Sequence, residues 1–200
     1  MDKLHKTIVI FGGSFNPPHL GHAHAIATIE KFFPCDEIWV MPSDSRRDKT
    51  IVVAGGHRLA MLNAMIAELF QHSAVPVKVS SLELDRGKPT STYETFLELK
   101  KVYPDITFYF MVNSDVAGDI KEKWMDGEKL FREAHFLVMQ RPPFEIPRVL
   151  PPHTVILKNA PVGAPVTSTE IRALIASGKP FVQYVAASVA AYIKDCKLYQ

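Results

Sequence analysis

Two histidines near the start of the chain lie three residues apart and follow a pair of glycines. The segment 12–22 reads GGSFNPPHLGH. Imidazole rings and free backbone N–H groups both donate hydrogen bonds to phosphate oxygens. If a helix begins near Gly21, its first turn offers free N–H groups, and His19 and His22 can share one face of that turn. These residue types at this spacing predict a phosphate-binding loop.

Glycines and prolines are expected to shape this loop in different ways. Gly12 and Gly13 permit backbone conformations closed to other residues and let a ligand approach the backbone closely. Pro17 and Pro18 stiffen the loop and cannot donate hydrogen bonds. The segment is not a Walker A loop, because the Gly-Lys-Ser/Thr ending is absent.

Two other interpretations of the segment stay open at this point. It could be a tight turn that carries two surface histidines. Alternatively, His19, His22 and His24 could ligate a metal ion, although no cysteine or close carboxylate accompanies them.

A strand and a helix must hold the loop, and both are predicted on its two sides. Strand and helix signals then alternate along the chain. The expected strands are 7–11, 37–41, 77–84, 106–112, 135–139 and 154–157. The expected helices are 21–33, 56–71, 92–102, several segments up to 133, 168–177 and 182–195.

This alternation predicts an α/β fold, a doubly wound parallel sheet of the Rossmann-like type with a helical C-terminus. The continuous apolar strands fit a sheet covered on both faces. Ligands of such sheets bind beyond the carboxyl ends of the strands, where the strand order reverses. If strands 7–11 and 106–112 are neighbours, the segment 12–22 and the residues Asn113-Ser114-Asp115 flank one crevice.

Composition limits the remaining possibilities. The 200 residues, 47% of them hydrophobic, predict one domain spanning 1–200 with a substantial core. A net charge of +2 gives no reason to expect nucleic-acid or membrane partners, and no apolar run approaches the length of a bilayer span. Cys35 and Cys196 suggest neither a disulfide framework nor a zinc site, so we expect reduced thiols in a cytoplasmic protein.

A second candidate phosphate site lies near the end of the chain, in the segment 166–172. It reads VTSTEIR, and Thr167 with Glu170 matches a capping box at the start of a helix. Arg172, one turn in, adds a positive charge near the free amides, so this helix start could hold a polyphosphate. Capping alone would also explain the Ser/Thr cluster.

The segment 12–22 closely resembles the first signature of the bacterial nicotinate mononucleotide adenylyltransferases, a branch of the nucleotidyltransferase superfamily marked by His-x-Gly-His. Sister branches usually have Thr at the position of His19 or Asp at the position of Asn16. The segment 166–172 is similar to the family's second signature, Ile-Ser-Ser-Thr-x-Ile-Arg, which in the family binds the β- and γ-phosphates of ATP. Arg141-Pro142-Pro143 and the ending 192–199 also resemble the family.

The resemblance implies roles for three further residues. It places Asp115 on a ribose hydroxyl of ATP, Trp124 beside the pyridine ring and Thr92 against the nicotinate carboxylate. The sequence departs from the family at Asn113, where the family has Gly, and the spacing from Asp115 to Trp124 is one residue longer. The family's Pro-Pro-His-Lys loop is replaced by the basic segment 45–49, for which a solvated loop is the simpler interpretation. Trp124 could equally be a core or surface aromatic, and the Ser/Thr run around Thr92 could be an N-cap.

The reaction implied by the resemblance joins ATP and nicotinate mononucleotide into deamido-NAD and pyrophosphate, a step of NAD biosynthesis. The mononucleotide's own phosphate is the nucleophile, so no enzyme nucleophile is required. Mg²⁺ would arrive bound to ATP. The expected catalytic residues are His19 and His22; the expected ATP- and phosphate-binding residues are Gly12, Gly13, Ser14, Phe15, Gly21, Asp115, Ser168, Thr169 and Arg172; the expected mononucleotide-binding residues are Thr92 and Trp124.

Two alternative functions fit the same residues. The enzyme could use nicotinamide mononucleotide, which differs from the nicotinate form by an amide in place of a carboxylate. The chain could also be a nucleotide-binding module of the superfamily with weak or no turnover, an idea motivated by Asn113 and by the changed loop at 45–49.

Overall fold

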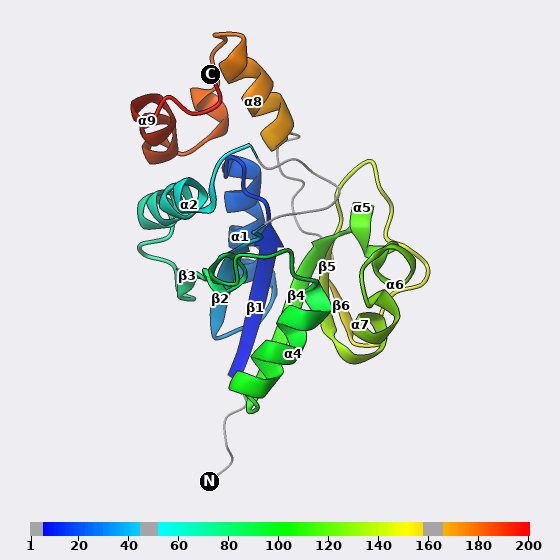
Figure 1. Cartoon of the computed structure of the whole chain (residues 1–200). Helices are drawn as coiled ribbons and strands as arrows, with labels where there is room; N and C mark the ends of the chain where they lie inside the picture. Colours follow the sequence, from blue (N-terminus) through cyan, green and yellow to red (C-terminus); the bar gives the residue numbers. More distant parts are fainter. Residues whose placement is uncertain (1–5, 45–51, 158–165) are drawn as a thin grey trace.

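The computed structural model describes residues 6–44, 52–157 and 166–200. Six parallel strands form one sheet in the order β3-β2-β1-β4-β5-β6 (Figure 1). The strands are β1 (Lys6–Gly13), β2 (Glu37–Pro42), β3 (Val77–Val79), β4 (Ile106–Asn113), β5 (His135–Met139) and β6 (Thr154–Leu157). The predicted doubly wound sheet is confirmed, and the strand order reverses between β1 and β4.

Helices connect these strands and close the chain. They are α1 (Leu20–Phe32), α2 (Gly55–Leu69), α3 (Leu82–Asp85), α4 (Thr92–Val102), α5 (Ser114–Ala117), α6 (Ile120–Lys123), α7 (Gly127–Glu133), α8 (Ser168–Ala176), the 3₁₀ turn η1 (Val182–Tyr184) and α9 (Ala187–Asp195). Within the described ranges, no helix is long and apolar enough to cross a membrane.

The third strand is shorter than the predicted 77–84. The backbone N–H of Ser80 donates the last ladder bond to the carbonyl of Val40 at 2.9 Å. In a regular parallel ladder the next donor would be residue 42 of β2, which is a proline and has no N–H. The chain therefore leaves the sheet, and Leu82–Asp85 forms the short helix α3.

The predicted helix 182–195 is also wrong in its first part. Only Ala187–Asp195 is α-helical, and Val185 is extended, with φ −128° and ψ 162°. Apolar residues at positions 181, 185, 189 and 193 gave the sequence a helical period. All four are buried in the structure, although the backbone at Val185 is extended rather than helical.

Side chains of the central strand alternate between two apolar layers. Val9 and Phe11 face the first apolar cluster, in which α1 and α2 cover the sheet and residues of α8 and α9 extend the cluster beyond the strand ends. Ile8 and Ile10 face the second apolar cluster, which α4, α5, α6 and α7 cover. Because successive strand residues point to opposite faces, one continuous apolar run supplies both layers.

The C-terminal helices α8 and α9 lie beyond the carboxyl ends of the strands (Figure 1). Helix α9 begins after Ala186, which offers no side-chain cap. The carboxylate of Glu68, at the end of α2, accepts hydrogen bonds from the N–H groups of Ala187 at 3.1 Å and Ser188 at 2.7 Å. A residue of α2 thus satisfies the first free donors of α9 and fixes its position.

We predict that Glu68→Ala lowers the free energy of unfolding by about 1 kcal/mol, the usual cost of losing a helix cap. Glu68→Gln is the matched control, because its amide keeps one acceptor oxygen and should lose less. Urea denaturation of the three proteins measures the difference. Equal stability of Glu68→Ala and wild type would show that this cap does not stabilise the fold.

Candidate active site

The loop between β1 and α1 ends in a capping box made of two imidazole rings. His19 is the N-cap residue of α1, and its Nδ1 accepts a hydrogen bond from the N–H of Gly21 at 3.1 Å. The Nδ1 of His22 accepts one from the N–H of His19, also at 3.1 Å. Because both Nδ1 atoms act as acceptors, each neutral ring carries its proton on Nε2. Both Nε2–H groups are therefore the donors that these rings can offer to a ligand.

The same arrangement keeps both rings uncharged. Their centroids lie 3.7 Å apart with an angle of 33° between the ring planes, and His19 is only 7% exposed. Burial, assisted by the positive charge of Arg141, lowers the pKa of His19 to about 4. Burial, followed by the effects of His19 and Arg141, lowers the pKa of His22 well below its usual value. At neutral pH the two rings are hydrogen-bond donors without a net charge.

Space, rather than unusual backbone angles, explains the glycines of the loop. A Cβ on Gly21 would lie 2.9 Å from the His19 ring, and one on Gly13 would lie 3.1 Å from the Phe15 ring. Gly12 is exposed and has no atom within 4 Å of such a Cβ, which leaves room for close approach of a ligand. Gly12 and Gly13 do not use the backbone conformations that glycine permits, because neither has a positive φ. The residue with one is Phe15, at +45°.

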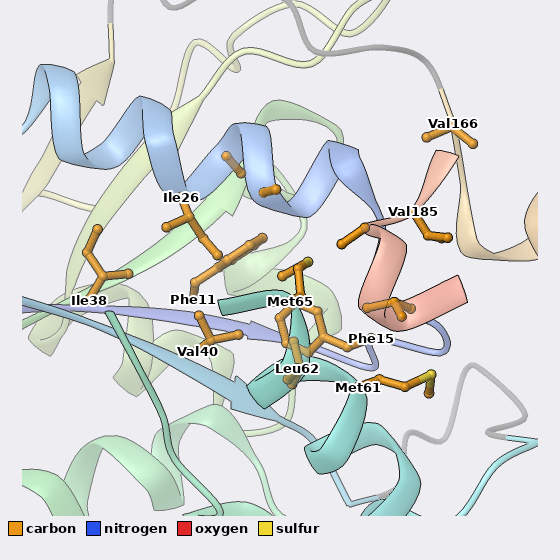
Figure 2. Packing of buried hydrophobic residues seen from close by; sticks show 14 of the residues in the cluster. Phe11, Phe15, Ile26, Ile38, Val40, Met61, Leu62, Met65, Val166 and Val185 are labelled. Atoms are coloured by element: carbon orange, nitrogen blue, oxygen red, sulfur yellow. The ribbon is translucent and has the colours of Figure 1, made fainter. Parts of the chain in front are cut away.

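Phe15 joins the loop to the core. Its ring is 1% exposed and meets the rings of Phe11 and His22 edge-on, with centroids 5.4 and 4.8 Å away. It lies in the first apolar cluster with Met61 and Leu62 of α2 (Figure 2). Of this predicted phosphate-binding residue, only the backbone is available to a ligand.

Arg58 of α2 is a buried cation beneath the loop. It is 1% exposed, and its guanidinium donates to the carbonyls of Ser14 at 2.9 Å and Ser43 at 2.7 Å. It also donates to the carbonyls of Asp44 at 3.2 Å and Val53 at 3.3 Å. These bonds join the loop after β1 to the loop after β2.

Sequence reasoning missed Arg58, although the sequence holds a signal for it. Arg58 shares a helical face with Met61, Leu62 and Met65, which are all buried. A charged residue in such an apolar stripe needs partners inside the protein.

The second candidate segment packs against the first. Thr167 and Glu170 form the predicted capping box of α8, with bonds of 3.2 and 2.8 Å. The hydroxyl of Ser168 donates to the carbonyl of Pro17 at 2.8 Å. The guanidinium of Arg172 donates to the carbonyl of Asn16 at 2.7 Å and to the Thr169 hydroxyl at 3.3 Å. Segments 156 residues apart therefore share one site.

Asp115 follows β4 at the point where the strand order reverses. One of its carboxylate oxygens accepts from Arg141 at 3.0 Å, whereas the other is buried without a partner. The side-chain oxygen of Asn113 is also buried and unpartnered. Arg141 follows β5, and its charge acts on both histidines. The crevice predicted between the ends of the first and fourth strands therefore brings Asp115 and the histidine pair to one edge of the sheet.

Thr92 and Trp124 belong to elements on the other face of the sheet, at the start of α4 and directly after α6. Thr92 is the first residue of α4, and Ser91 rather than Thr92 caps that helix, in a box with Glu94. Trp124 is partly buried against the second apolar cluster. No hydrogen bond or ring contact of the described residues joins either side chain to the loop after β1. The basic segment 45–49 lies outside the described residues.

In the described parts of the chain, no group of three or more His, Cys, Asp or Glu side chains is placed to hold a metal ion. The two Nδ1 atoms of the histidine pair already accept backbone hydrogen bonds. The site instead offers neutral N–H donors, the arginines Arg141 and Arg172, and the carboxylate of Asp115, while the buried Arg58 donates to backbone carbonyls of the loops. Such a set binds phosphate groups and a hydroxyl-bearing neighbour.

A doubly wound sheet with hydrogen-bond donors for phosphate at its switch point is typical of an α/β nucleotide-binding protein. A model of the family described as cytidylyltransferase-like matches residues 10–174. The chain belongs to this family.

The similarity to known proteins extends over nearly the whole chain. "Probable nicotinate-nucleotide adenylyltransferase" of Bacillus licheniformis is 31% identical over 197 residues, which cover 98% of this chain and 99% of the relative. The protein of the same name from Streptomyces coelicolor is 33% identical over 192 residues, 94% of this chain and 98% of the relative. The structure of Plasmodium falciparum nicotinic acid mononucleotide adenylyltransferase complexed with NaAD superposes with a TM-score of 0.83, at 27% identity and 98% coverage of both chains. The family expected from the two signatures is confirmed.

The buried neutral His19 predicts a loss of stability in mild acid. Below a pH of about 6.5 the unfolded histidine takes up a proton that the folded ring, with its pKa of about 4, does not bind. Stability therefore falls as the pH drops, by about 2 kcal/mol for this group between about pH 7.5 and about pH 5.

His19→Asn keeps an N-cap acceptor and removes the titrating ring. Urea denaturation at the two pH values should show a smaller acid loss for this variant, by about the same 2 kcal/mol. An equal acid loss in both proteins would mean that His19 titrates normally in the fold.

Proposed function

We propose that this protein transfers the adenylyl group of ATP to nicotinate mononucleotide, giving deamido-NAD and pyrophosphate. A phosphate oxygen of the mononucleotide attacks the α-phosphorus of ATP, and the bond from that phosphorus to the oxygen of the departing pyrophosphate breaks. The observation that carries the proposal is the pair of neutral Nε2–H donors, His19 and His22, held at the switch point of the sheet. The relatives named for this reaction support the choice of substrates.

Catalysis of such a transfer needs positioning and charge stabilisation rather than a covalent intermediate. We assign His22 to the phosphate oxygens that gain charge in the transition state, and His19 to the ATP phosphates beside it. Neutral donors suit this role, since they do not have to lose a proton before or after the reaction. The backbone around Gly12, Gly13 and Ser14 would meet the phosphate of either substrate, and the open space beside Gly12 supports this role.

The first turn of α8 would hold the departing pyrophosphate. Ser168 and Thr169 begin this helix, so their backbone N–H groups are among its free donors. The hydroxyl proton of Ser168 is donated to Pro17, which leaves the backbone as the donor of this residue. Arg172 adds positive charge one turn further on.

Three further residues would bind the nucleoside parts of the two substrates. The unpartnered carboxylate oxygen of Asp115 would accept a hydrogen bond from a ribose hydroxyl of ATP. We retain Thr92 for the nicotinate carboxylate and Trp124 for the pyridine ring. The start of α4 supports the first of these roles, since a helix N-terminus favours a negative charge.

Mg²⁺ would be bound by the ATP phosphates and by water, because the carboxylate of Asp115 is already paired with Arg141. When bound, the ion neutralises charge on the phosphate oxygens. We further propose that residues 1–200 form one nucleotidyltransferase domain that acts in the cytoplasm without nucleic-acid or membrane partners. The small net charge supports this proposal, as do the free thiols of Cys35 and Cys196.

Pyrophosphate release from Mg-ATP, measured with nicotinate mononucleotide and in parallel with nicotinamide mononucleotide, tests the proposed function. We expect a strong preference for the acid. Comparable or better use of the amide would keep the mechanism and overturn the choice of substrate. Absence of release with either mononucleotide would overturn the enzymatic proposal in favour of nucleotide binding alone.

We predict that His22→Ala lowers kcat at least about 100-fold, which corresponds to about 2.7 kcal/mol of barrier. The matched control is His72→Ala, which removes an exposed histidine after α2 and should stay within twofold of wild type. Because His22 also caps the N–H of His19, the melting temperature of each variant is measured and turnover is assayed well below it. Turnover of His22→Ala within threefold of wild type would remove His22 from the mechanism.

A further inference from the structure

The end of the chain returns to the phosphate-binding loop at one residue. The hydroxyl of Tyr199 donates a hydrogen bond to the side-chain oxygen of Asn16 at 2.8 Å, across 183 residues of sequence. Asn16 is 2% exposed and lies three residues before His19. Its carbonyl is held separately by Arg172, at 2.7 Å. Asn16 is thus fixed through its backbone by one element and through its side chain by another.

The Tyr199 hydroxyl is a dedicated donor in this contact. Burial raises its pKa above the usual value, although the charges of Arg172 and Arg58 act in the opposite direction. The phenol therefore stays protonated at any ordinary pH. Tyr199 also has a φ of +65°, in the left-handed region that non-glycine residues rarely adopt. The chain turns sharply at its end and brings this ring to Asn16.

Other contacts hold the backbone of the loop but leave the Asn16 side chain to Tyr199. Arg58 binds the carbonyl of Ser14, and Ser168 binds the carbonyl of Pro17. Between Phe15 and His19 the side chains are those of Asn16 and two prolines, so Asn16 has the only polar one. Its hydrogen bond to Tyr199 is the one polar side-chain contact in this stretch among the described residues.

We infer that Tyr199 is a positioning residue for the proposed adenylyl transfer, an inference that rests on that function. By holding Asn16 it fixes the segment that leads into His19, and hence the direction in which the two imidazole Nε2–H groups point. A buried acceptor that loses its partner must find another donor or move. Movement of Asn16 would displace the N-cap, and small displacements of donors are costly in phosphoryl transfer.

Tyr199→Phe tests the inference because it removes only the hydroxyl. Tyr192→Phe is the matched control: it makes the same change in the same C-terminal segment, where the hydroxyl lies 3.0 Å from Nδ1 of His57 in α2. We expect kcat/KM for ATP to fall about tenfold in Tyr199→Phe, equivalent to about 1.4 kcal/mol, and to stay within twofold in Tyr192→Phe. Equal activities of the two variants would overturn the inference.

A double-mutant cycle separates positioning from a general loss of packing. Asn16→Ala removes the acceptor, so adding Tyr199→Phe to it should cause no further loss. Asn16→Asp keeps an acceptor oxygen, so Tyr199→Phe should still lower kcat/KM in that background, which remains informative if Asn16→Ala does not fold. Independent effects in every background would contradict action through Asn16.

Binding of a non-hydrolysable ATP analogue distinguishes this inference from the proposed function. We expect about fivefold weaker binding in Tyr199→Phe than in Tyr192→Phe, because the loop contacts the ATP phosphates before the reaction. Wild type could bind the analogue and yet release no pyrophosphate from ATP in the turnover assay. The proposed function would then fail, and the affinities for the analogue alone would decide the role of Tyr199. Equal affinities of Tyr199→Phe and Tyr192→Phe for the analogue would overturn the positioning role of Tyr199.

Discussion

The reciprocal hydrogen bonds between the backbone at the start of α1 and the two imidazole Nδ1 atoms determine what the site can do. One backbone N–H occupies each Nδ1, so each ring must carry its proton on Nε2. Burial and the nearby guanidinium of Arg141 then keep the rings neutral. The helix start therefore presents two neighbouring donors whose charge does not change over the physiological pH range.

Most of the surrounding structure serves to hold this helix start in place. Gly21 leaves the space that the His19 ring needs, and Phe15 anchors the loop in the core against the edge of His22. The loop carbonyls, which would repel a polyanion, are turned toward Arg58 and Arg172 and partly neutralised by them. The elements that supply these groups are far apart in sequence, so the site exists only in the complete fold.

The sequence predicted the parts of this account that depend on local pattern. The alternation of strands and helices and the capping box of α8 follow from period and residue type, whereas the pairing of β1 with β4 was only a condition at the level of the sequence and is shown by the structure. The ends of elements depended on tertiary contacts instead: β3 stops where Pro42 cannot donate, and α9 starts where Glu68 can cap it. Spacing marks Arg58 as a charge in an apolar helical stripe, but its partners, like the partner of Tyr199, are contacts between distant residues that spacing does not reveal.

The tautomer and charge of the histidine pair can be measured directly. Two-bond ¹H–¹⁵N correlation spectra of the protein labelled at histidine nitrogens distinguish the Nε2–H tautomer, the Nδ1–H tautomer and the imidazolium form. The account predicts that His19 and His22 are both neutral Nε2–H rings at pH 7, and that His19 remains so down to about pH 5. An imidazolium ring or a proton on Nδ1 of either residue at pH 7 would contradict it, because the capping box could not then form.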